Sequence, residues 1–363
     1  MQKKILKKST TNERLQGVIM VKNNNWIGEN VFITGINGFV GGNLAKEFVK
    51  KGANVFGLVR NNNRDTFLYY EGLADKVTLI NGDLTDKELM LRIISEERIN
   101  YVYHLAAQVE VEIGTRNPFL TFEINIRGTY SLLEAVRIHP ESVKAVVVAS
   151  TDKSYGSYGI DKMPYKEDYP LIPIYPYETS KACADMIARS YSSDIYDLPI
   201  VVTRFCNIYG PGQLNFSAIF PDVIRSALGY SRFIPRGSGV QIRDFIYIDD
   251  VIPLYMIIAE KLAEDPKKYS GEVFNAGTNT PISIKTVVED IYKLVSNEKD
   301  LKQVIELMEG KIMVGEIEQQ YMDFEKLNVY FGWEPKYSLR EGMIRTIEWF
   351  KEYLGHQYEY KLK

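Results

Sequence analysis

A hydroxyl, a carboxylate and an amine stand side by side in this chain at Thr151, Asp152 and Lys153. They follow the apolar run "KAVVVA", which is typical of a buried strand, and they precede "SYGSYG", which is rich in turn residues. The segment therefore places an acid and a base next to each other at the tip of a predicted core strand. A plain turn would also use Ser, Asp and Gly, so a role in chemistry needs support from the rest of the chain.

A second candidate pair follows one strand-to-helix unit later, in "YETSK", where Tyr177 precedes Lys181 by four residues. On a helix the two side chains share one face, about 6 Å apart along the axis. A free tyrosine, with a pKa of about 10, is a poor base at neutral pH. A nearby ammonium and an oxidised nicotinamide would both favour the phenolate. The spacing alone is common, but its position after Asp152 favours a catalytic pair over a solvated one.

A glycine-rich turn, "TGINGFVGG", lies between a predicted strand and a predicted helix. Glycines at this point let the backbone turn tightly and approach a pyrophosphate, whose charge sits at a helix N-terminus. The strand–turn–helix context predicts dinucleotide binding. The predicted contacts here are Gly35, Asn37, Gly38, Phe39, Val40 and Gly41.

The choice between NAD and NADP stays open in the sequence. An acid after the second strand would bind the ribose of NAD, but "LVRNNNR" has none there. Arg60 stands near that place, either to receive the 2′-phosphate of NADP or as a surface arginine. In "HLAAQ", His104 is either part of the cofactor channel or a hydrogen-bonded histidine at a strand end. Further predicted cofactor contacts are Asp83, Leu84, Leu105, Ala106 and Ala107.

The elements that must position these residues alternate along the chain. From Asn30, short apolar strands alternate with amphipathic helices, which predicts an α/β fold with a doubly wound parallel sheet of the Rossmann type. We predict that this domain comprises residues 26–205 and about 245–276. A smaller α/β C-terminal lobe for the substrate would take about 206–244 and 277–357. Residues 1–25 are interpreted as a basic leader, for which a disordered segment is one reading, and they are not assigned to either domain.

Composition excludes several classes of protein. The 363 residues carry a net charge of −3, which gives no sign of a nucleic-acid partner or an anionic membrane partner. No apolar run reaches the roughly 20 residues of a membrane span. The two cysteines make neither a disulfide framework nor a metal cluster, so we expect no metal and a reducing, cytoplasmic setting.

Taken in order, "TGINGFVGG", "STDKSYG", "YETSK", "RFCNIYGPG" and "IRDFIYIDDV" resemble the extended short-chain dehydrogenase/reductase superfamily over residues 26–354. The resemblance implies a Rossmann domain, a tightly bound NAD or NADP and a nucleotide-sugar substrate. It also implies a homodimer or a dimer of dimers, formed by the helices after Phe119 and after Tyr177.

Within that superfamily, Thr-Asp-Lys before the Tyr-x-x-x-Lys pair resembles the CDP-glucose 4,6-dehydratases. Two segments depart from that subgroup. The cofactor turn "INGFVGG" differs from theirs, and "LVRNNN" is closer to the GDP-mannose 4,6-dehydratases. The dehydratase reaction is therefore better supported than the nucleotide, and a dehydratase of a GDP- or UDP-sugar stays open. A nucleotide-sugar 4-epimerase is the nearest alternative reaction, and a non-catalytic dinucleotide-sensing protein is a remote one.

The resemblance implies a role for each site residue. Tyr177 takes the C4 hydroxyl proton during oxidation, with Lys181 lowering its pKa and Thr151 orienting the oxygen. Asp152 is the acid at C6 and Lys153 the base at C5. The positions that match substrate contacts are Gln108, Asn207 and Arg243.

Overall fold

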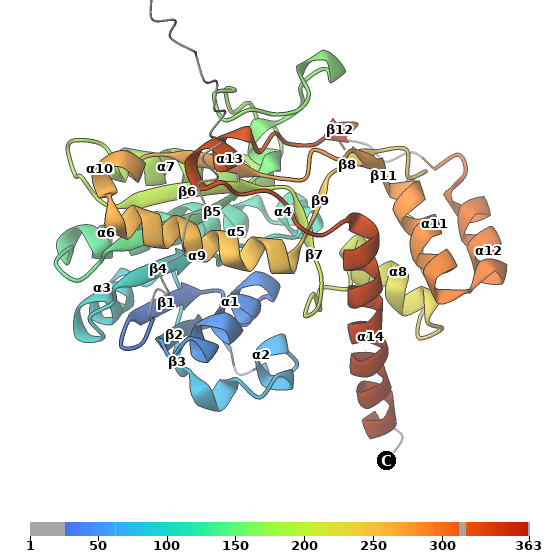
Figure 1. Ribbon diagram of the computed structural model, residues 1–363, viewed down its shortest axis with the longest axis horizontal. Helices are drawn as coiled ribbons and strands as arrows, with labels where there is room; N and C mark the ends of the chain where they lie inside the picture. Colours follow the sequence, from blue (N-terminus) through green and yellow to red (C-terminus); the bar gives the residue numbers. More distant parts are fainter. Residues whose placement is uncertain (1–25, 62, 312–316, 362–363) are drawn as a thin grey trace, which may run out of the picture.

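The computed structural model describes residues 26–61, 63–311 and 317–361, so the predicted leader lies outside the described residues. Its main feature is a sheet of seven strands in the order β3-β2-β1-β4-β5-β6-β10 (Figure 1). Every neighbouring pair is parallel, which confirms the predicted doubly wound sheet. The strands are β1 (Asn30–Thr34), β2 (Asn54–Val59), β3 (Thr78–Asn81), β4 (Tyr101–His104), β5 (Ala145–Thr151), β6 (Ile200–Phe205) and β10 (Val273–Ala276).

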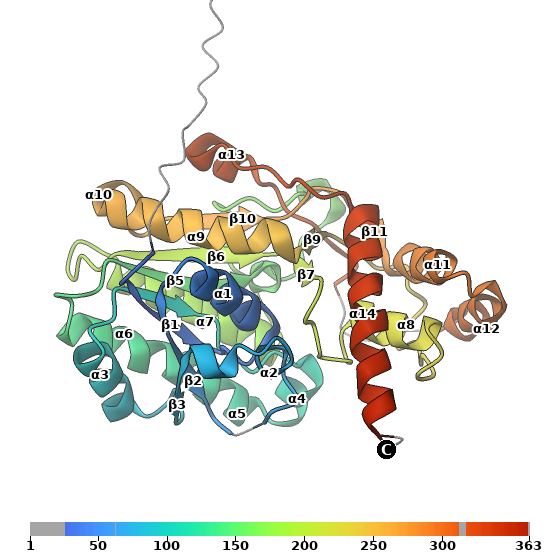
Figure 2. The same cartoon turned by 60° about the horizontal axis from the view of Figure 1, so that its bottom comes forward.

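Helices cover both faces of this sheet, because its central strands are apolar on both sides. One face packs on α1 (Phe39–Lys50) and α9 (Ile248–Glu264), and the other on α3 (Lys87–Glu96), α6 (Gly128–Ile138) and α7 (Pro176–Tyr191) (Figure 2). The carboxyl ends of all seven strands consequently meet at one edge, where ligands bind in folds of this type.

The helical segment from Pro118 to Ile138 is continuous but not uniform. It consists of α5 (Pro118–Phe122), a π-helical turn η2 (Glu123–Arg127) and α6, and it follows the short α4 (Val111–Arg116). The π turn contains the buried Asn125, and such turns are frequent near functional sites.

A second group of elements, which we call the small lobe, lies at one end of the molecule, with α14 (Leu339–Lys361) between it and the large sheet (Figures 1 and 2). Its three-stranded sheet has the order β11-β8-β12. The lobe comprises α8 (Ile219–Ala227), β8 (Ile242–Arg243), β11 (Ile282–Ser283), α11 (Ile284–Val295), α12 (Glu298–Met308) and β12 (Gln319–Gln320).

The two parts are joined by the parallel pair β7 (Asn207–Tyr209) and β9 (Phe245–Tyr247). Among the described helices, none combines the length and apolar character that a membrane crossing requires. The remaining elements are α2 (Phe67–Tyr70), η1 (Ala74–Lys76), η3 (Asp152–Tyr155), η4 (Ile160–Lys162), α10 (Pro266–Tyr269) and α13 (Glu325–Phe331).

Candidate active site

The glycine turn between β1 and α1 leaves no room for side chains. Gly35 has a φ of +77°, and a Cβ on it would lie 3.0 Å from the Ala106 backbone. A Cβ on Gly41 would lie 2.2 Å from the Gly35 carbonyl oxygen, so the turn needs glycine at both places. Gly38 is the N-cap of α1. Beside it, the buried Oδ1 of Asn37 has no hydrogen-bond partner among the described residues.

Polar side chains join the ends of β1, β4 and α6. The Thr34 hydroxyl lies 2.9 Å from Nδ1 of His104, and Nε2 of that ring lies 2.8 Å from the Thr129 hydroxyl. Burial, with Lys181 nearby, lowers the pKa of His104 to about 3, so the ring is neutral. Of the two sequence interpretations, this geometry supports the hydrogen-bonded histidine at a strand end.

The segment after β4, residues 105–108, is held by hydrogen bonds to Thr34 at the end of β1 and to Asn125. The backbone N–H groups of Leu105 and Ala106 each donate to the Thr34 hydroxyl at 3.1 Å. The N–H of Gln108 donates to Asn125 Oδ1 at 2.7 Å. Leu105, Ala106 and the following Ala107 are half-buried, and they lie beside the glycine turn.

The far side of the sheet edge carries two opposite charges. Arg60 follows β2 and Asp83 follows β3, and both residues are exposed. Desolvation raises the pKa of Asp83, but hydrogen bonds from Thr85 and the charges of Arg60 and Arg127 outweigh it and lower the value overall. A carboxylate and a guanidinium thus stand at neighbouring strand ends, while Leu84 is buried against Gly128 of α6.

The acid–base turn, residues 151–153, is where β5 passes into η3. The Thr151 hydroxyl donates to Asp152 Oδ1 at 2.9 Å and accepts from the Lys153 N–H at 3.4 Å. Asp152 is 3% exposed, and its other oxygen, Oδ2, has no hydrogen-bond partner among the described residues. A buried carboxylate oxygen without a partner is costly, so this turn is prepared for a polar ligand.

Tyr177 lies in the first turn of α7 and faces this acid–base turn. Burial raises the pKa of its phenol well above the usual range, and the carboxylates of Asp152 and Glu178 add to that shift. A hydrogen bond with Thr151 opposes it. The phenol is therefore protonated in the protein alone, and the phenolate needs additional positive charge nearby.

Lys181 lies one turn further along α7, as the sequence spacing predicts. Its ammonium donates to the carbonyl of Ala149 in β5. Burial lowers the pKa of Lys181 to about 8, and the nearby Asp185 limits this shift. The amine is thus close to its titration point in neutral solution.

Behind α7 lies a group that the sequence did not suggest, which we call the support network. Arg204 on β6 donates from Nε and Nη2 to the two oxygens of Asp185 at 2.8 and 3.1 Å. Its Nη1 donates to the Tyr155 hydroxyl at 2.8 Å, and that hydroxyl donates to Asn275 at 2.7 Å. The network therefore connects α7, β6, β10 and the end of η3.

The predicted substrate residues occupy three different positions. Arg243 is buried in β8, and its guanidinium donates to a carbonyl of its own strand at 2.8 Å. Asn207 begins β7 and donates to the Asp244 carbonyl at 3.2 Å. The Gln108 side chain donates to the Glu110 carbonyl at 3.0 Å. Arg243 is connected to the acid–base turn indirectly, because it pairs with Gln320 of β12, which accepts from Lys153.

β12 brings a residue to the site that sequence reasoning missed. Gln320 is fully buried, and its Oε1 accepts from the Lys153 ammonium at 3.4 Å. Nothing in "EQQYMD" signals this, because the contact spans 167 positions and β12 is only two residues long. Glu178 was also missed. Its carboxylate accepts from the N–H groups of Tyr175 and Ile174, which caps α7.

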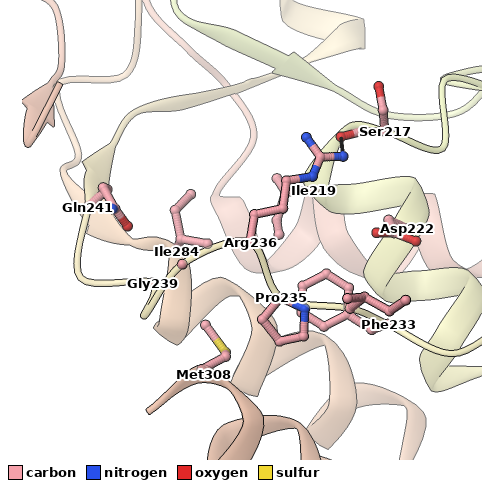
Figure 3. A pocket seen from close by; sticks show the side chains of 12 residues that line it. Ser217, Ile219, Asp222, Phe233, Pro235, Arg236, Gly239, Gln241, Ile284 and Met308 are labelled. Atoms are coloured by element: carbon pink, nitrogen blue, oxygen red, sulfur yellow. Dashed lines mark hydrogen bonds between the residues drawn. The ribbon is translucent and has the colours of Figure 1, made fainter. Parts of the chain in front are cut away.

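The small lobe contains a pocket of about 140 Å³ (Figure 3). One of its lining residues, Gln241, precedes Arg243 by two positions. Arg236 extends across it and donates to the Ser217 carbonyl at 2.9 Å. Aliphatic and aromatic side chains form one wall, and polar groups of Asp222 and Gln241 stand at its sides. The lining residues are Ser217, Ile219, Asp222, Phe233, Ile234, Pro235, Arg236, Gly237, Gly239, Gln241, Ile284 and Met308.

Comparison with known proteins gives a consistent result over nearly the whole chain. A family model described as GDP-mannose 4,6 dehydratase matches residues 32–346. The dTDP-D-glucose 4,6-dehydratase of Homo sapiens is 29% identical over 334 residues, covering 89% of this chain and 90% of that protein. The CDP-glucose 4,6-dehydratase of Salmonella typhimurium is 28% identical over 348 residues, covering 92% and 94%.

Solved structures agree on the fold and divide on the reaction. The dTDP-glucose 4,6-dehydratase of Bacillus anthracis in complex with NAD has a TM-score of 0.75 and 28% identity, covering 90% of this chain and 97% of that one. The UDP-glucose 4-epimerase of Thermotoga maritima with UDP-glucose has a TM-score of 0.77 and 28% identity, covering 90% and 99%.

Proposed function

The chain belongs to the GDP-mannose 4,6 dehydratase family, and on that premise we propose that it converts a nucleotide-activated hexose into its 4-keto-6-deoxy derivative by dehydration, with a bound NAD or NADP. The observation that carries the proposal is the adjacency of Thr151, Asp152 and Lys153 opposite Tyr177 and Lys181. An epimerase needs the hydroxyl, the phenol and the lysine, but it has no use for an acid–base pair at C5 and C6.

The residues around the glycine turn fit a dinucleotide. Gly35 packs against the Ala106 backbone and Gly41 against the Gly35 carbonyl, which keeps the turn tight at the start of α1, and the buried Oδ1 of Asn37 offers an acceptor without a partner among the described residues. We propose that this turn, with Leu105, Ala106 and Ala107, holds the cofactor. Arg60 and Asp83 would face its adenosine end, which leaves NAD and NADP open. When bound, the cofactor accepts a hydride from C4 of the sugar and returns it to C6.

In the oxidation step, Tyr177 takes the proton of the C4 hydroxyl while the Thr151 hydroxyl orients that oxygen. Burial and two carboxylates hold the phenol protonated, so the reaction needs positive charge close to Tyr177. The Lys181 ammonium, one helical turn away, contributes it. With a pKa of about 8, Lys181 carries this charge in neutral solution and loses it in alkali.

In the elimination step, the C4 ketone makes the C5 hydrogen acidic. We propose that the Lys153 amine takes that proton while Asp152 gives a proton to the C6 hydroxyl. Water leaves, and a C5–C6 double bond forms. The two groups are adjacent on one turn, so they can act on neighbouring carbons of one sugar.

For the substrate, we propose that the nucleobase enters the small-lobe pocket and that Arg243 binds the diphosphate. Arg243 stands two residues from Gln241 in the pocket and is paired with Gln320 at the acid–base turn, which supports a diphosphate contact between these two regions. Asn207 and Gln108 are further candidate contacts. The Thr-Asp-Lys sequence favours CDP-glucose, and GDP- and UDP-sugars are the alternatives.

The assay is turnover in heavy water of CDP-glucose, GDP-mannose, UDP-N-acetylglucosamine and dTDP-glucose, each offered separately. A dehydratase releases water and places solvent deuterium at C5, and we expect the fastest reaction with CDP-glucose. Because the fold is equally close to a UDP-glucose 4-epimerase, the rival outcome is a product that keeps its C6 hydroxyl and inverts C4. That outcome, or no turnover of any of the four, would reject the proposal.

We also propose that the protein assembles as a homodimer or a dimer of dimers. Large apolar side chains stand exposed on α5, α6 and α7, which contact one another. Phe119 is 74% exposed and Met186 57% exposed, and such exposure on adjacent helices is typical of an interface. Light scattering on Phe119→Asp and Met186→Lys should show a smaller particle than the unmodified chain. The cytoplasmic location stays a prediction from the sequence.

A further inference from the structure

Gln320 reaches the acid–base turn from the other part of the molecule, and its position is firmly held. In β12 it is paired in register with Arg243 of β8. The chain then runs beside Tyr165, whose N–H donates to the Tyr321 carbonyl at 3.0 Å and whose carbonyl accepts from the Asp323 N–H at 3.1 Å. The side chain is fully buried. It is therefore fixed by backbone pairing on both sides.

The amide of Gln320 is only half used by the protein. Its Oε1 accepts from Lys153 Nζ at 3.4 Å, whereas its Nε2 has no hydrogen-bond partner among the described residues. A hydrogen bond with the Gln320 side chain lowers the pKa of the Tyr165 phenol against a larger effect of burial, while the phenol's own proton goes to the Gly156 carbonyl at 2.6 Å. The amide nitrogen carries two N–H groups, and the phenol oxygen can accept from only one of them, so the second is available to a ligand.

A second buried atom without a partner belongs to the residue that precedes Lys153 on the acid–base turn. It is Oδ2 of Asp152, which is also near enough to affect the Tyr165 phenol. An oxygen of Asp152 and the amide nitrogen of Gln320 thus lie at the acid–base turn without a hydrogen-bond partner among the described residues. This is the arrangement that hydroxyl groups of a sugar would complete.

The chemical type of Gln320 suits a lysine that must give up its proton. An amide oxygen orients an amine without adding negative charge, whereas a carboxylate at the same place would hold the ammonium charged. The titratable and charged groups around Lys153 are Asp152 on its own turn, Tyr177 and Glu178 on α7, Tyr165 on the following loop and Arg243 on β8. Burial raises the pKa of Glu178, and the charge of Lys153 and the backbone N–H groups at the start of α7 oppose that shift, so one carboxyl group already interacts with Lys153 from α7.

We propose that Gln320 is a positioning residue for the elimination step, which holds the Lys153 amine toward the sugar through Oε1 and binds a sugar oxygen through Nε2. This inference rests on the proposed function, since it assigns Gln320 to one half of that reaction. It predicts that Gln320 acts on proton removal at C5 and not on oxidation at C4.

The test compares Gln320→Glu, Gln320→Met and the control Gln319→Glu in the full chain with its co-purified cofactor. Gln319 precedes Gln320 on β12, so its side chain points to the opposite face and adds the same charge elsewhere. Deuterium incorporation at C5 reports elimination, and absorbance of the reduced nicotinamide in a single turnover reports oxidation. Both are measured against pH with CDP-glucose.

For Gln320→Glu we expect the pH profile of C5 exchange to move about 1–3 units toward alkali, as an added carboxylate beside an amine does. Exchange at neutral pH then falls about 10-fold or more, and oxidation changes little. Gln320→Met should slow exchange without moving the profile, and Gln319→Glu should leave both unchanged. An unmoved profile in Gln320→Glu, or equal losses in both steps, would overturn the proposal.

A second measurement needs no turnover and so separates this inference from the proposed function. Lysine amines are labelled competitively with acetic anhydride across pH and read by peptide mass spectrometry. The Lys153 labelling curve should move to higher pH in Gln320→Glu but not in Gln319→Glu. If the Lys153 labelling curve does not move, Gln320 is not the partner of Lys153, and this conclusion holds independently of which sugar the enzyme turns over.

Discussion

The start and the middle of α7 have opposite kinds of surroundings. At its start, Tyr177 faces an acid–base turn where buried polar atoms, Asp152 Oδ2 and Gln320 Nε2, lack partners. Two turns later, Asp185 meets Arg204 in a network where none of the described polar side-chain atoms lacks one. Both regions are buried, so burial does not explain the difference.

The difference indicates a division of labour along one helix. Groups that must meet a substrate keep unused hydrogen-bonding capacity, which costs stability in the free protein. Groups that only hold the helix in place use all of theirs. Substitutions behind the helix should therefore change stability first, and substitutions in front of it should change binding or rate first.

The largest effect is expected behind the helix, for Arg204→Met. This change leaves the Asp185 carboxylate buried without its bidentate partner and also removes the donor to Tyr155. Removing one partner of a buried ion pair costs about 3–5 kcal/mol, and we expect the upper end of that range here. Urea unfolding measures it.

The matched control is Arg189→Met, because Arg189 bonds to the same carboxylate from a side chain that is 41% exposed. Exposed pairs contribute about 0–1 kcal/mol, so this variant should stay near the unmodified chain. Equal losses in the two variants would contradict the distinction between network and surface.

The next effect is expected in front of the helix, for Tyr177→Phe. Loss of the proposed base should lower kcat about 10³-fold, equivalent to about 4 kcal/mol of barrier, with unfolding free energy nearly unchanged. Tyr175→Phe, on an exposed side chain beside it, should retain activity. A Tyr177→Phe enzyme that keeps its rate would remove Tyr177 from the chemistry.

Lys181 lies between the two regions, and its titration gives the third prediction. Its pKa is about 8 in the folded protein and 10.5 as the ordinary value, so between these the unfolded chain binds more protons and stability rises with pH. Below pH 8 the Lys181 side chain is charged in both the folded and the unfolded state. The folded protein then bears the full cost of burying the ammonium. Any stability advantage of Lys181→Met should shrink by about 3 kcal/mol between neutral pH and pH 10.5.

Urea unfolding of both proteins across this range measures that difference, since the other lysines and tyrosines titrate alike in the two chains and cancel. A stability difference that stays constant with pH would mean that burial does not lower the pKa of Lys181.

The smallest effect concerns the other unsatisfied atom at the sheet edge, Asn37 Oδ1. Asn37→Ala should weaken NAD binding about 10-fold, a typical value for one hydrogen bond, without destabilising the free protein. Asn43→Ala should destabilise the free protein without weakening NAD binding, because Asn43 donates to the Phe39 and Pro211 carbonyls inside the protein. Calorimetry and urea unfolding measure the two quantities, and a shared response would contradict the distinction.

Much of the fold was predictable, because alternation of apolar strands and amphipathic helices is a local pattern. The seven parallel strands and α7 follow it closely. The π turn at Glu123–Arg127 could not be predicted, since no local pattern marks where a helix gains a residue per turn. The division into domains and the roles of the site residues stay predictions.

The sequence by itself determined the short-range parts of the site. These are the glycine turn, the order Thr151-Asp152-Lys153 and the four-residue step from Tyr177 to Lys181, which a strand tip and a helical turn convert directly into geometry. Only the tertiary structure decided that Gln320 meets Lys153 and that Arg204 meets Asp185. Such contacts depend on how separate elements pack, and no repeat or spacing along the chain encodes which side chain a folded neighbour will face.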